Sequence, residues 1–237
     1  MRYDSINLML PTRRRLAGLK RFVHTAIDKA DEAGRLYFSF LVDADDSPTM
    51  HWALGFQWNH KHVIIDHDTT GPNLSRYYNR LYDESVYSEE RTLVSMVADD
   101  MYFDSQGWDT AILNAVNARK GAAVVWCDDC YIQHEKMAVN LFTTRRVVDG
   151  ACLGEFMWSR WRANMIDVVW TEIAKRAGIA CYLPDVRLVH EHNSGKRVKD
   201  ETHLRLSKHY TFAAGKWHIL NPYIDIAVKA LRENGVA

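Results

Sequence analysis

The 237-residue sequence lacks the glycine-rich loops with which many proteins hold phosphate groups. Neither G-x-x-x-x-G-K nor G-x-G-x-x-G occurs anywhere in the chain. Because those motifs place backbone N–H groups around a phosphate, their absence argues against P-loop NTPases and dinucleotide-binding enzymes. The sequence also has no internal repeat, low-complexity stretch or linker, so a single domain over residues 1–237 is predicted.

Long hydrophobic runs are absent as well. No apolar run approaches the roughly 20 residues that a membrane-spanning helix needs. The N-terminal MRYDSINLML is followed too soon by PTRRR to be a secretory signal, so a cytoplasmic protein is expected. Cysteine is scarce: Cys127 and Cys130 form a C-x-x-C pair, but Cys152 and Cys181 do not supply the second pair of a zinc site. Free structural thiols are therefore predicted.

The chain has no excess of charge of either sign, with 30 Lys and Arg residues against 30 Asp and Glu residues. The distribution is uneven, however. Between Arg187 and His218 there are seven basic and three acidic residues, a local net charge of +4, together with five of the eleven histidines. Such a segment can attract phosphate-bearing ligands, or it can be a solvated C-terminal surface, and the sequence leaves both interpretations open.

Apolar runs alternate with segments of helical period along the chain. Strands are predicted at 6–10, 37–47, 62–68, 93–97, 122–127 and 181–192. Helices are predicted at 16–33, 75–86, 107–119, 164–177 and 219–233. Strands that alternate with helices indicate βαβ units, so the predicted fold is α/β: a mixed, mostly parallel, Rossmann-like sheet flanked by helices.

Acidic residues follow three successive predicted strands. They are Asp43, Asp45 and Asp46 after the second strand, Asp66 and Asp68 after the third, and Asp99 and Asp100 after the fourth. In open α/β sheets, ligands bind outside the carboxyl ends of the strands. So many carboxylates at one edge require a cation or hydrogen-bond donors. Mg²⁺ and Mn²⁺ take such oxygen ligands together with substrate phosphates, although aspartates that cap the next segment would produce the same pattern.

The first predicted strand runs into Pro11-Thr12-Arg13-Arg14-Arg15 and then into a helix. Thr12 can cap that helix or donate a hydrogen bond to a phosphate, and the arginines can pair with phosphates. This turn and the strand-end acids therefore predict a phosphate-bearing ligand at the same edge of the sheet.

Taken in order, these motifs resemble those of glycosyltransferases of the GT-A fold, in particular the family 2-like enzymes that use nucleotide-sugar donors. LPTRRR resembles the first strand and its Pro-Thr-Arg turn, and LVDADDS resembles the second strand. The segment from Gly71 to Asn79 resembles the glycine, arginine and asparagine ahead of the metal motif, VADD resembles the D-x-D motif, and MYFDSQGWD resembles the segment after it. The likeness extends over roughly residues 6–192.

The resemblance implies a nucleotide-sugar-binding half in residues 1–110 and an acceptor-binding half in residues 111–237. The residues that it assigns to the donor are Pro11, Thr12, Arg13, Arg15, Asp43, Asp45, Arg76, Asn79 and Asp99.

By the same resemblance, Asp100 and His190 would hold Mn²⁺ or Mg²⁺, which would neutralise the leaving diphosphate. In an inverting enzyme Asp167, at the start of a helix that ends at Gly178, would remove the proton of the acceptor hydroxyl; the sequence leaves inverting and retaining stereochemistry both open. Glu155, in LGEF, is a second candidate acid near the acceptor. The implied activity is transfer of a hexose or pentose from a nucleoside-diphosphate sugar, with UDP as the expected nucleotide.

The acceptor and two other protein classes stay open. The acceptor is either a soluble saccharide or protein, or a nucleic acid with a hydroxymethylated base, as some phage enzymes modify. The sequence departs from the family pattern at Ala98, where D-x-D has its outer acid, and at Ile166, where a glutamate precedes the aspartate. A catalytically inactive nucleotide-sugar-binding protein is therefore one alternative. A nucleotidyltransferase is the other, disfavoured by the lack of glycines after the first strand.

Overall fold

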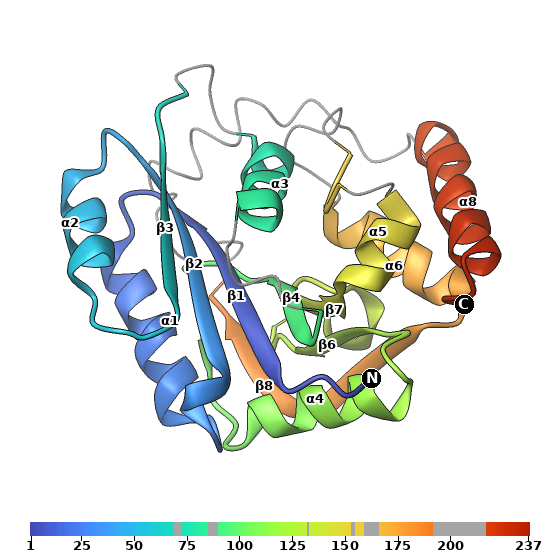
Figure 1. The fold of residues 1–237 in the computed structure, drawn as a ribbon, viewed down its shortest axis with the longest axis horizontal. Coiled ribbons are helices and arrows are strands. Elements are labelled where there is room, and N and C mark those ends of the chain that lie inside the picture. Colours follow the sequence, from blue (N-terminus) through green and yellow to red (C-terminus); the bar gives the residue numbers. More distant parts are fainter. Residues whose placement is uncertain (69–72, 85–89, 132, 153–154, 159–165, 192–216) are drawn as a thin grey trace.

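The computed structural model describes residues 1–68, 73–84, 90–131, 133–152, 155–158, 166–191 and 217–237 (Figure 1). Its described strands form one mixed sheet in the order β3-β2-β1-β4-β7-β6-β8-β5. They are β1 (Ser5–Thr12), β2 (Leu36–Asp43), β3 (Lys61–Asp66), β4 (Thr92–Met96), β5 (Met101–Phe103), β6 (Val124–Asp128), β7 (Leu141–Thr144) and β8 (Ala180–His190). The α-helices are α1 (Leu16–Asp28), α2 (Ser47–Gly55), α3 (Leu74–Glu84), α4 (Trp108–Ala118), α5 (Arg145–Cys152), α6 (Ile166–Ala177) and α8 (Trp217–Glu233).

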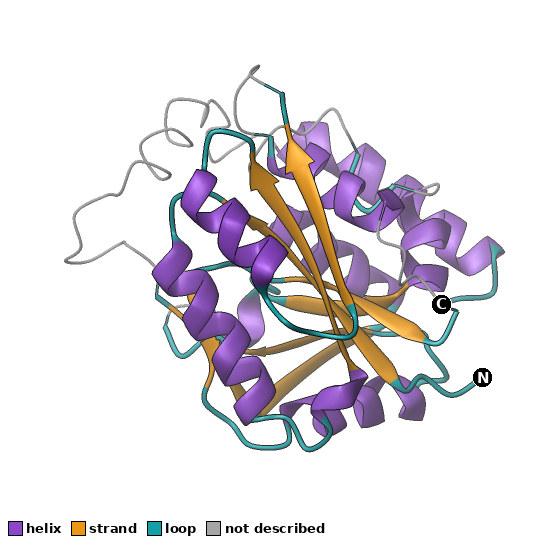
Figure 2. Cartoon of the chain, turned by 60° about the vertical axis from the view of Figure 1, so that its left-hand side comes forward, coloured by secondary structure: helices purple, strands orange, loops and turns teal. Residues whose placement is uncertain are grey.

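Helices cover both faces of the sheet, as the strands and helices of Figure 2 show. One hydrophobic core lies between the sheet and α1, α2 and α4, and it includes Phe22, Ala53 and Ile112. The other lies between the sheet and α3, α5, α6 and α8, and it includes Tyr78 and Trp170. The sheet is therefore the middle layer of three, and its strands are buried on both faces, which explains their continuous apolar runs.

The predicted α/β fold with a mixed, mostly parallel sheet is confirmed. β1 pairs in parallel with β2 and β4, β2 pairs in parallel with β3, and β6 pairs in parallel with β8. The antiparallel pairs are β4 with β7, β6 with β7, and β5 with β8. Parallel strands at β1 to β4 place their carboxyl ends at one edge of the sheet, where the predicted ligand site lies.

Several elements differ from the prediction. The second strand ends at Asp43 rather than at Ser47, because Asp46 caps α2 and accepts a hydrogen bond from the Thr49 N–H at 3.4 Å. The predicted last strand ends at His190, and His192 lies outside the described residues. The short strands β5 and β7 and the helices α2 and α5 were not predicted, because each is too short to show a clear period.

Two further expectations concern chemistry rather than fold. Among the described residues, no helix is long and apolar enough to cross a membrane. Cys127, Cys130 and Cys181 form no disulfide, as predicted for these three. Burial raises the pKa of the Cys127 thiol well above its ordinary value, and Cys127 is therefore an inert core residue.

Candidate active site

The turn after β1 contacts the acid pair that follows β4. The Thr12 hydroxyl donates to Asp99 Oδ2 at 2.7 Å, and Arg15 Nη1 lies 3.0 Å from Asp99 Oδ1 and 3.1 Å from Asp100 Oδ2. Asp99 is only 4% exposed. Burial raises the pKa of Asp99 to about 6; Arg15 and Thr12 oppose that rise, and the charge of Asp100 adds to it. The structure thus brings together four of the predicted donor and metal residues.

His190 reaches this corner from the second half of the chain. The antiparallel pairing of β5 with β8 aligns Met101 with His190 and places His190 Nε2 3.3 Å from Asp100 Oδ1. Main-chain hydrogen bonds hold this end of β8: the His190 N–H donates to the Asp129 carbonyl at 3.1 Å, and the Glu191 N–H donates to the Asp100 carbonyl at 2.9 Å. Both predicted metal residues therefore lie side by side.

The protonation of His190 reflects its acidic surroundings. Burial lowers the pKa of His190, but the hydrogen bond with Asp100 and the charges of Asp100, Asp129 and Asp167 together raise it above its ordinary value. The acidic groups around the imidazole of His190 therefore favour a positive charge at this position.

A second group of predicted donor residues lies at the ends of β1 and β2. Arg13 donates to Asp43 at 2.7 Å and binds both carboxylate oxygens of Asp45, at 2.8 and 2.7 Å. Pro11 lies opposite Leu41 in the ladder between these strands. Pro11, Arg13, Asp43 and Asp45 are therefore neighbours, as a shared nucleotide contact requires.

Arg76, also predicted as a donor contact, lies on α3 and binds the acids that follow β3. It pairs with Asp68 and with Asp66, the latter at 2.7 Å, and Arg80 pairs with the other oxygen of Asp66 at 2.8 Å. Arg80 was missed by sequence reasoning, although its position four residues after Arg76 places both on one helix face. Gly71, which belongs to the same motif, lies outside the described residues.

The side chain of Asn79 forms two hydrogen bonds with the main chain of Met157. Its side-chain amide donates to the Met157 carbonyl at 2.5 Å, and its side-chain oxygen accepts from the Met157 N–H at 2.7 Å. Both residues are buried. Asn79 thereby joins α3 to the segment at residues 155–158, and a contact with the donor, which the resemblance implies, stays a prediction.

Replacing Asn79 by alanine is expected to lower the free energy of unfolding by about 2–4 kcal/mol, because the buried N–H and carbonyl of Met157 would lose their partners. Urea unfolding measures this change. The matched control is Asn114→Ala, at an exposed position of α4, for which a change within about 0.5 kcal/mol is expected. Equal stability of the two variants would contradict the bridging role.

The two candidate acids of the acceptor side lie in different surroundings. Asp167 lies in the first turn of α6, is half-buried and accepts a hydrogen bond from the Val168 N–H at 2.8 Å. Burial raises the pKa of Asp167, while backbone N–H groups and the charge of His190 partly oppose that rise. Glu155 instead adds to the raised pKa of Asp83, at the end of α3. Of the two acids, Asp167 is therefore the one whose pKa depends on His190.

The Gly107-Trp108-Asp109 motif serves the fold rather than this site. Gly107 precedes α4 in the left-handed conformation, at φ 71°, and the Trp108 ring stacks on Phe103 at 3.8 Å between centroids. The buried Asp109 carboxylate accepts the N–H groups of Asp31 and Glu32, at 2.8 and 3.1 Å. These contacts join α4 to the segment after α1.

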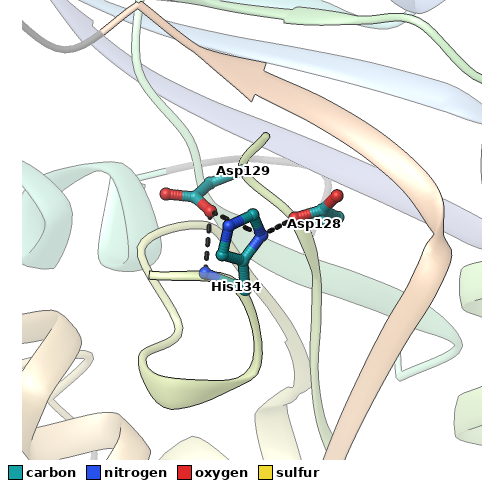
Figure 3. Close-up of side chains that lie close together, drawn as sticks. All are labelled: Asp128, Asp129 and His134. Atoms are coloured by element: carbon teal, nitrogen blue, oxygen red, sulfur yellow. Dashed lines mark hydrogen bonds and ion pairs between the residues drawn. The ribbon is translucent and has the colours of Figure 1, made fainter. Parts of the chain in front are cut away.

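One acid–histidine group was missed by sequence reasoning. Asp128 ends β6, Asp129 follows it directly, and His134 comes after the next turn (Figure 3). One ligand atom from each of the three lies within 4.8 Å of the others, so the group could hold a metal ion. The sequence does carry a signal for this group, because CDDC places two acids at the end of a predicted strand as VADD does.

Comparison with solved structures confirms the predicted fold. A mannosyltransferase, PcManGT from Pyrobaculum calidifontis, solved with GDP-Man and Mn²⁺, has a TM-score of 0.60 at 15% identity; the match covers 100% of this chain and 76% of that one. S. aureus TarS has a TM-score of 0.58 at 9% identity. The match covers 78% of this chain but only 36% of the TarS chain. The structure of TarS 1–349 with UDP-GlcNAc has a TM-score of 0.56 at 10% identity, and the match covers 97% of this chain and 73% of that one.

No protein-family model matches the sequence, and no curated protein matches it either. At such low identities the structural matches establish the fold, which is that of GT-A glycosyltransferases, as the sequence motifs had indicated.

Proposed function

We propose that the protein is a metal-dependent glycosyltransferase that moves a sugar from a nucleoside-diphosphate sugar, with UDP as the expected nucleotide, to an acceptor hydroxyl. The main support is the convergence of Thr12, Arg15, Asp99, Asp100 and His190 at one corner of a GT-A fold. The similar structures were solved with UDP-GlcNAc or with GDP-Man and Mn²⁺, which supports a nucleotide-sugar donor.

Asp100 and His190 fit a divalent ion. Two adjacent donor atoms of an octahedral ion with bonds of about 2.1 Å lie about 3 Å apart, and Asp100 Oδ1 and His190 Nε2 are 3.3 Å apart. A carboxylate together with an imidazole suits Mn²⁺ better than Mg²⁺, which prefers oxygen alone. When bound, the ion would supply positive charge to the leaving diphosphate.

The chain's own residues would complete donor binding. Arg15, held against Asp99 and Asp100, is placed to pair with a phosphate that lies beside Asp100. Asp99, which accepts from Thr12 as well as from Arg15, would orient that guanidinium or contact the ribose. Arg13 and its two aspartates would border the nucleoside, in the proposed donor half of residues 1–110.

Asp167 would act as the base in the proposed acceptor half, residues 111–237. Its raised pKa would favour proton uptake from a hydroxyl, and its electrostatic interaction with His190 supports a role beside the candidate donor site. The hydroxyl could belong to a saccharide, to a protein or to a hydroxymethylated base of DNA.

A panel of UDP-sugars and GDP-sugars tests the proposal. Release of the nucleoside diphosphate with water as acceptor is measured with Mn²⁺, with EDTA, and after Mn²⁺ is restored. We expect turnover of at least one donor that EDTA abolishes and Mn²⁺ restores. Thermal stabilisation by nucleotides without any turnover would instead indicate an inactive binding protein. Release of pyrophosphate from a nucleoside triphosphate and a sugar phosphate would indicate a nucleotidyltransferase.

A further inference from the structure

The imidazole of His134 is held by the carboxylate of Asp128. His134 Nδ1 lies 2.6 Å from Asp128 Oδ1 (Figure 3). Asp128 also accepts hydrogen bonds from the Cys130 N–H at 3.2 Å and from the Tyr182 hydroxyl. These donors hold the carboxylate in place, and the carboxylate orients the ring. Since Nδ1 is on Asp128, Nε2 is the ring nitrogen that the imidazole, 49% exposed, can present to a ligand.

Asp129 connects this turn to the candidate active site. Its buried carboxylate accepts the N–H groups of Gln133 and His134, at 3.2 and 2.8 Å, and its carbonyl accepts the His190 N–H at 3.1 Å. One residue therefore shapes the turn that carries His134 and ties it to the strand that carries His190. The imidazole of His134 has a defined place relative to the candidate metal corner.

The turn also holds two non-glycine residues in left-handed backbone conformations. Cys130 has φ 55° and His134 has φ 43°. Each costs on the order of 1 kcal/mol, and such strain persists where the surroundings enforce it, as at binding sites. In this turn the hydrogen bonds of Asp128 and Asp129 hold the strained backbone in place. One of the two strained residues is His134, whose ring is the one exposed to a ligand.

A metal ion is not the ligand that this group favours. Both oxygens of Asp129 accept N–H groups of the turn, so coordination would remove the hydrogen bonds that shape it. Asp128 and His134 already bind each other.

We propose that His134, oriented by Asp128, binds a hydroxyl of the acceptor, and that the acceptor is a neutral saccharide. The proposal rests on the proposed glycosyltransferase function. With Nδ1–H on the Asp128 carboxylate, Nε2 can accept a hydrogen bond from a sugar hydroxyl when the ring is neutral and can donate one when the ring is protonated. The hydrogen bond with Asp128 raises the pKa of His134 and so favours the protonated ring, and a sugar hydroxyl can pair with either form.

The charge and composition of the turn favour a saccharide over nucleic acid. The stretch from Asp128 to Lys136 contains three carboxylates and one lysine, which would repel a phosphate backbone. Tyr131, 41% exposed, offers an amphipathic aromatic surface beside it.

Two substitutions at position 134 separate the functions of the two ring nitrogens. In His134→Asn the side-chain amide can still reach Asp128, but nothing replaces Nε2. In His134→Gln the longer side chain carries its amide to the Nε2 position. The matched control is His51→Asn, which changes an exposed histidine whose Nδ1 lies 2.7 Å from the Ser47 carbonyl, on α2.

Transfer from the donor that the protein hydrolyses to a panel of p-nitrophenyl glycosides provides the assay. We expect His134→Asn to raise the KM for the glycoside about tenfold, the effect of one lost hydrogen bond, while the KM for the donor stays at the wild-type value. His134→Gln should restore most of the loss, and His51→Asn should match the wild type. Binding of Mn²⁺ alone, measured by electron paramagnetic resonance, should be unchanged in both His134 variants.

Three results would overturn the proposal. An unchanged KM for the glycoside in His134→Asn would exclude the contact. Loss of Mn²⁺ binding in that variant would make the group a metal site. Transfer to hydroxymethylated DNA but to no glycoside, with a steep dependence on salt, would identify a nucleic-acid acceptor. Absence of donor turnover in the wild type would instead overturn the proposed function itself, so the two failures are distinguishable.

Discussion

Replacing Asp100 by asparagine is expected to lower Mn²⁺-dependent turnover of the donor about a thousandfold. The two oxygens of Asp100 serve different partners, with Oδ1 3.3 Å from His190 and Oδ2 3.1 Å from Arg15. Asparagine keeps the size of the side chain but removes its negative charge. Its NH₂ group would also face either His190 or Arg15, and both of these side chains donate hydrogen bonds themselves. Donor hydrolysis and Mn²⁺ binding to the free protein measure the two consequences separately.

The matched control is Asp104→Asn, four residues further along the chain. Asp104 is 41% exposed and pairs with Arg187 at 2.8 Å, away from the corner formed by Asp99 and Asp100. Its neutralisation should leave turnover within about twofold of the wild type, because exposed ion pairs contribute little. Normal turnover in Asp100→Asn with retained folding would refute the assignment of the metal to Asp100.

Replacing Gly18 by alanine is expected to displace Asp99 and Asp100 through a clash between α1 and the main chain of Asp99. Alanine in place of glycine usually stabilises a helix by about 1 kcal/mol. In α1, however, a Cβ at position 18 would lie 2.2 Å from the carbonyl oxygen of Asp99, so the helix and the segment after β4 must move apart. We expect the free energy of unfolding to fall by about 2–3 kcal/mol and donor turnover to fall about a hundredfold, because Asp99 and Asp100 shift together.

Gly55→Ala distinguishes this clash from a general effect of alanine. Gly55 ends α2, and a Cβ there would meet no atom within 4 Å. That variant should be as stable as the wild type or slightly more stable in urea unfolding, with normal donor turnover. If Gly18→Ala behaved in the same way, the close approach of α1 to Asp99 would be refuted.

The local pattern of the sequence was sufficient for the first four strands. β1 to β4 are apolar runs that end at a proline turn or at acids, and the structure confirms each of them within a few residues. β7 has only four residues and β5 only three, so neither shows a period of its own. Their positions depend on the partners β4, β6 and β8, which are distant in the sequence.

The part of the candidate site that consists of polar residues at the ends of parallel strands could be predicted from the sequence. Thr12, Arg15, Asp99 and Asp100 follow parallel neighbours in the sheet, so their proximity follows from the topology. The role of Gly18 could not be predicted in the same way. It depends on the close approach of the Asp99 carbonyl oxygen, which leaves no room for a side chain at position 18.

Asn79 and His134 show the same limit. The motif around Asn79 indicated a donor contact, whereas its partner in the structure is the main chain of Met157, 78 residues away. The pairing of His134 with Asp128 crosses a turn whose backbone departs from ordinary conformations. Hydrogen bonds of this kind depend on how whole elements pack, and no local pattern encodes them.

The sequence by itself determined that acids and a Pro-Thr-Arg turn would meet at the carboxyl edge of a parallel sheet, because strand polarity places successive strand ends together. The resemblance to GT-A enzymes pointed to His190, but only the tertiary structure decided that this side chain reaches that corner. The antiparallel pairing of β5 with β8 brings residue 190 to within 3.3 Å of residue 100 across 90 positions of the chain. Its register is set by the packing of the whole domain, since three residues of β5 carry too few contacts to select a partner alone.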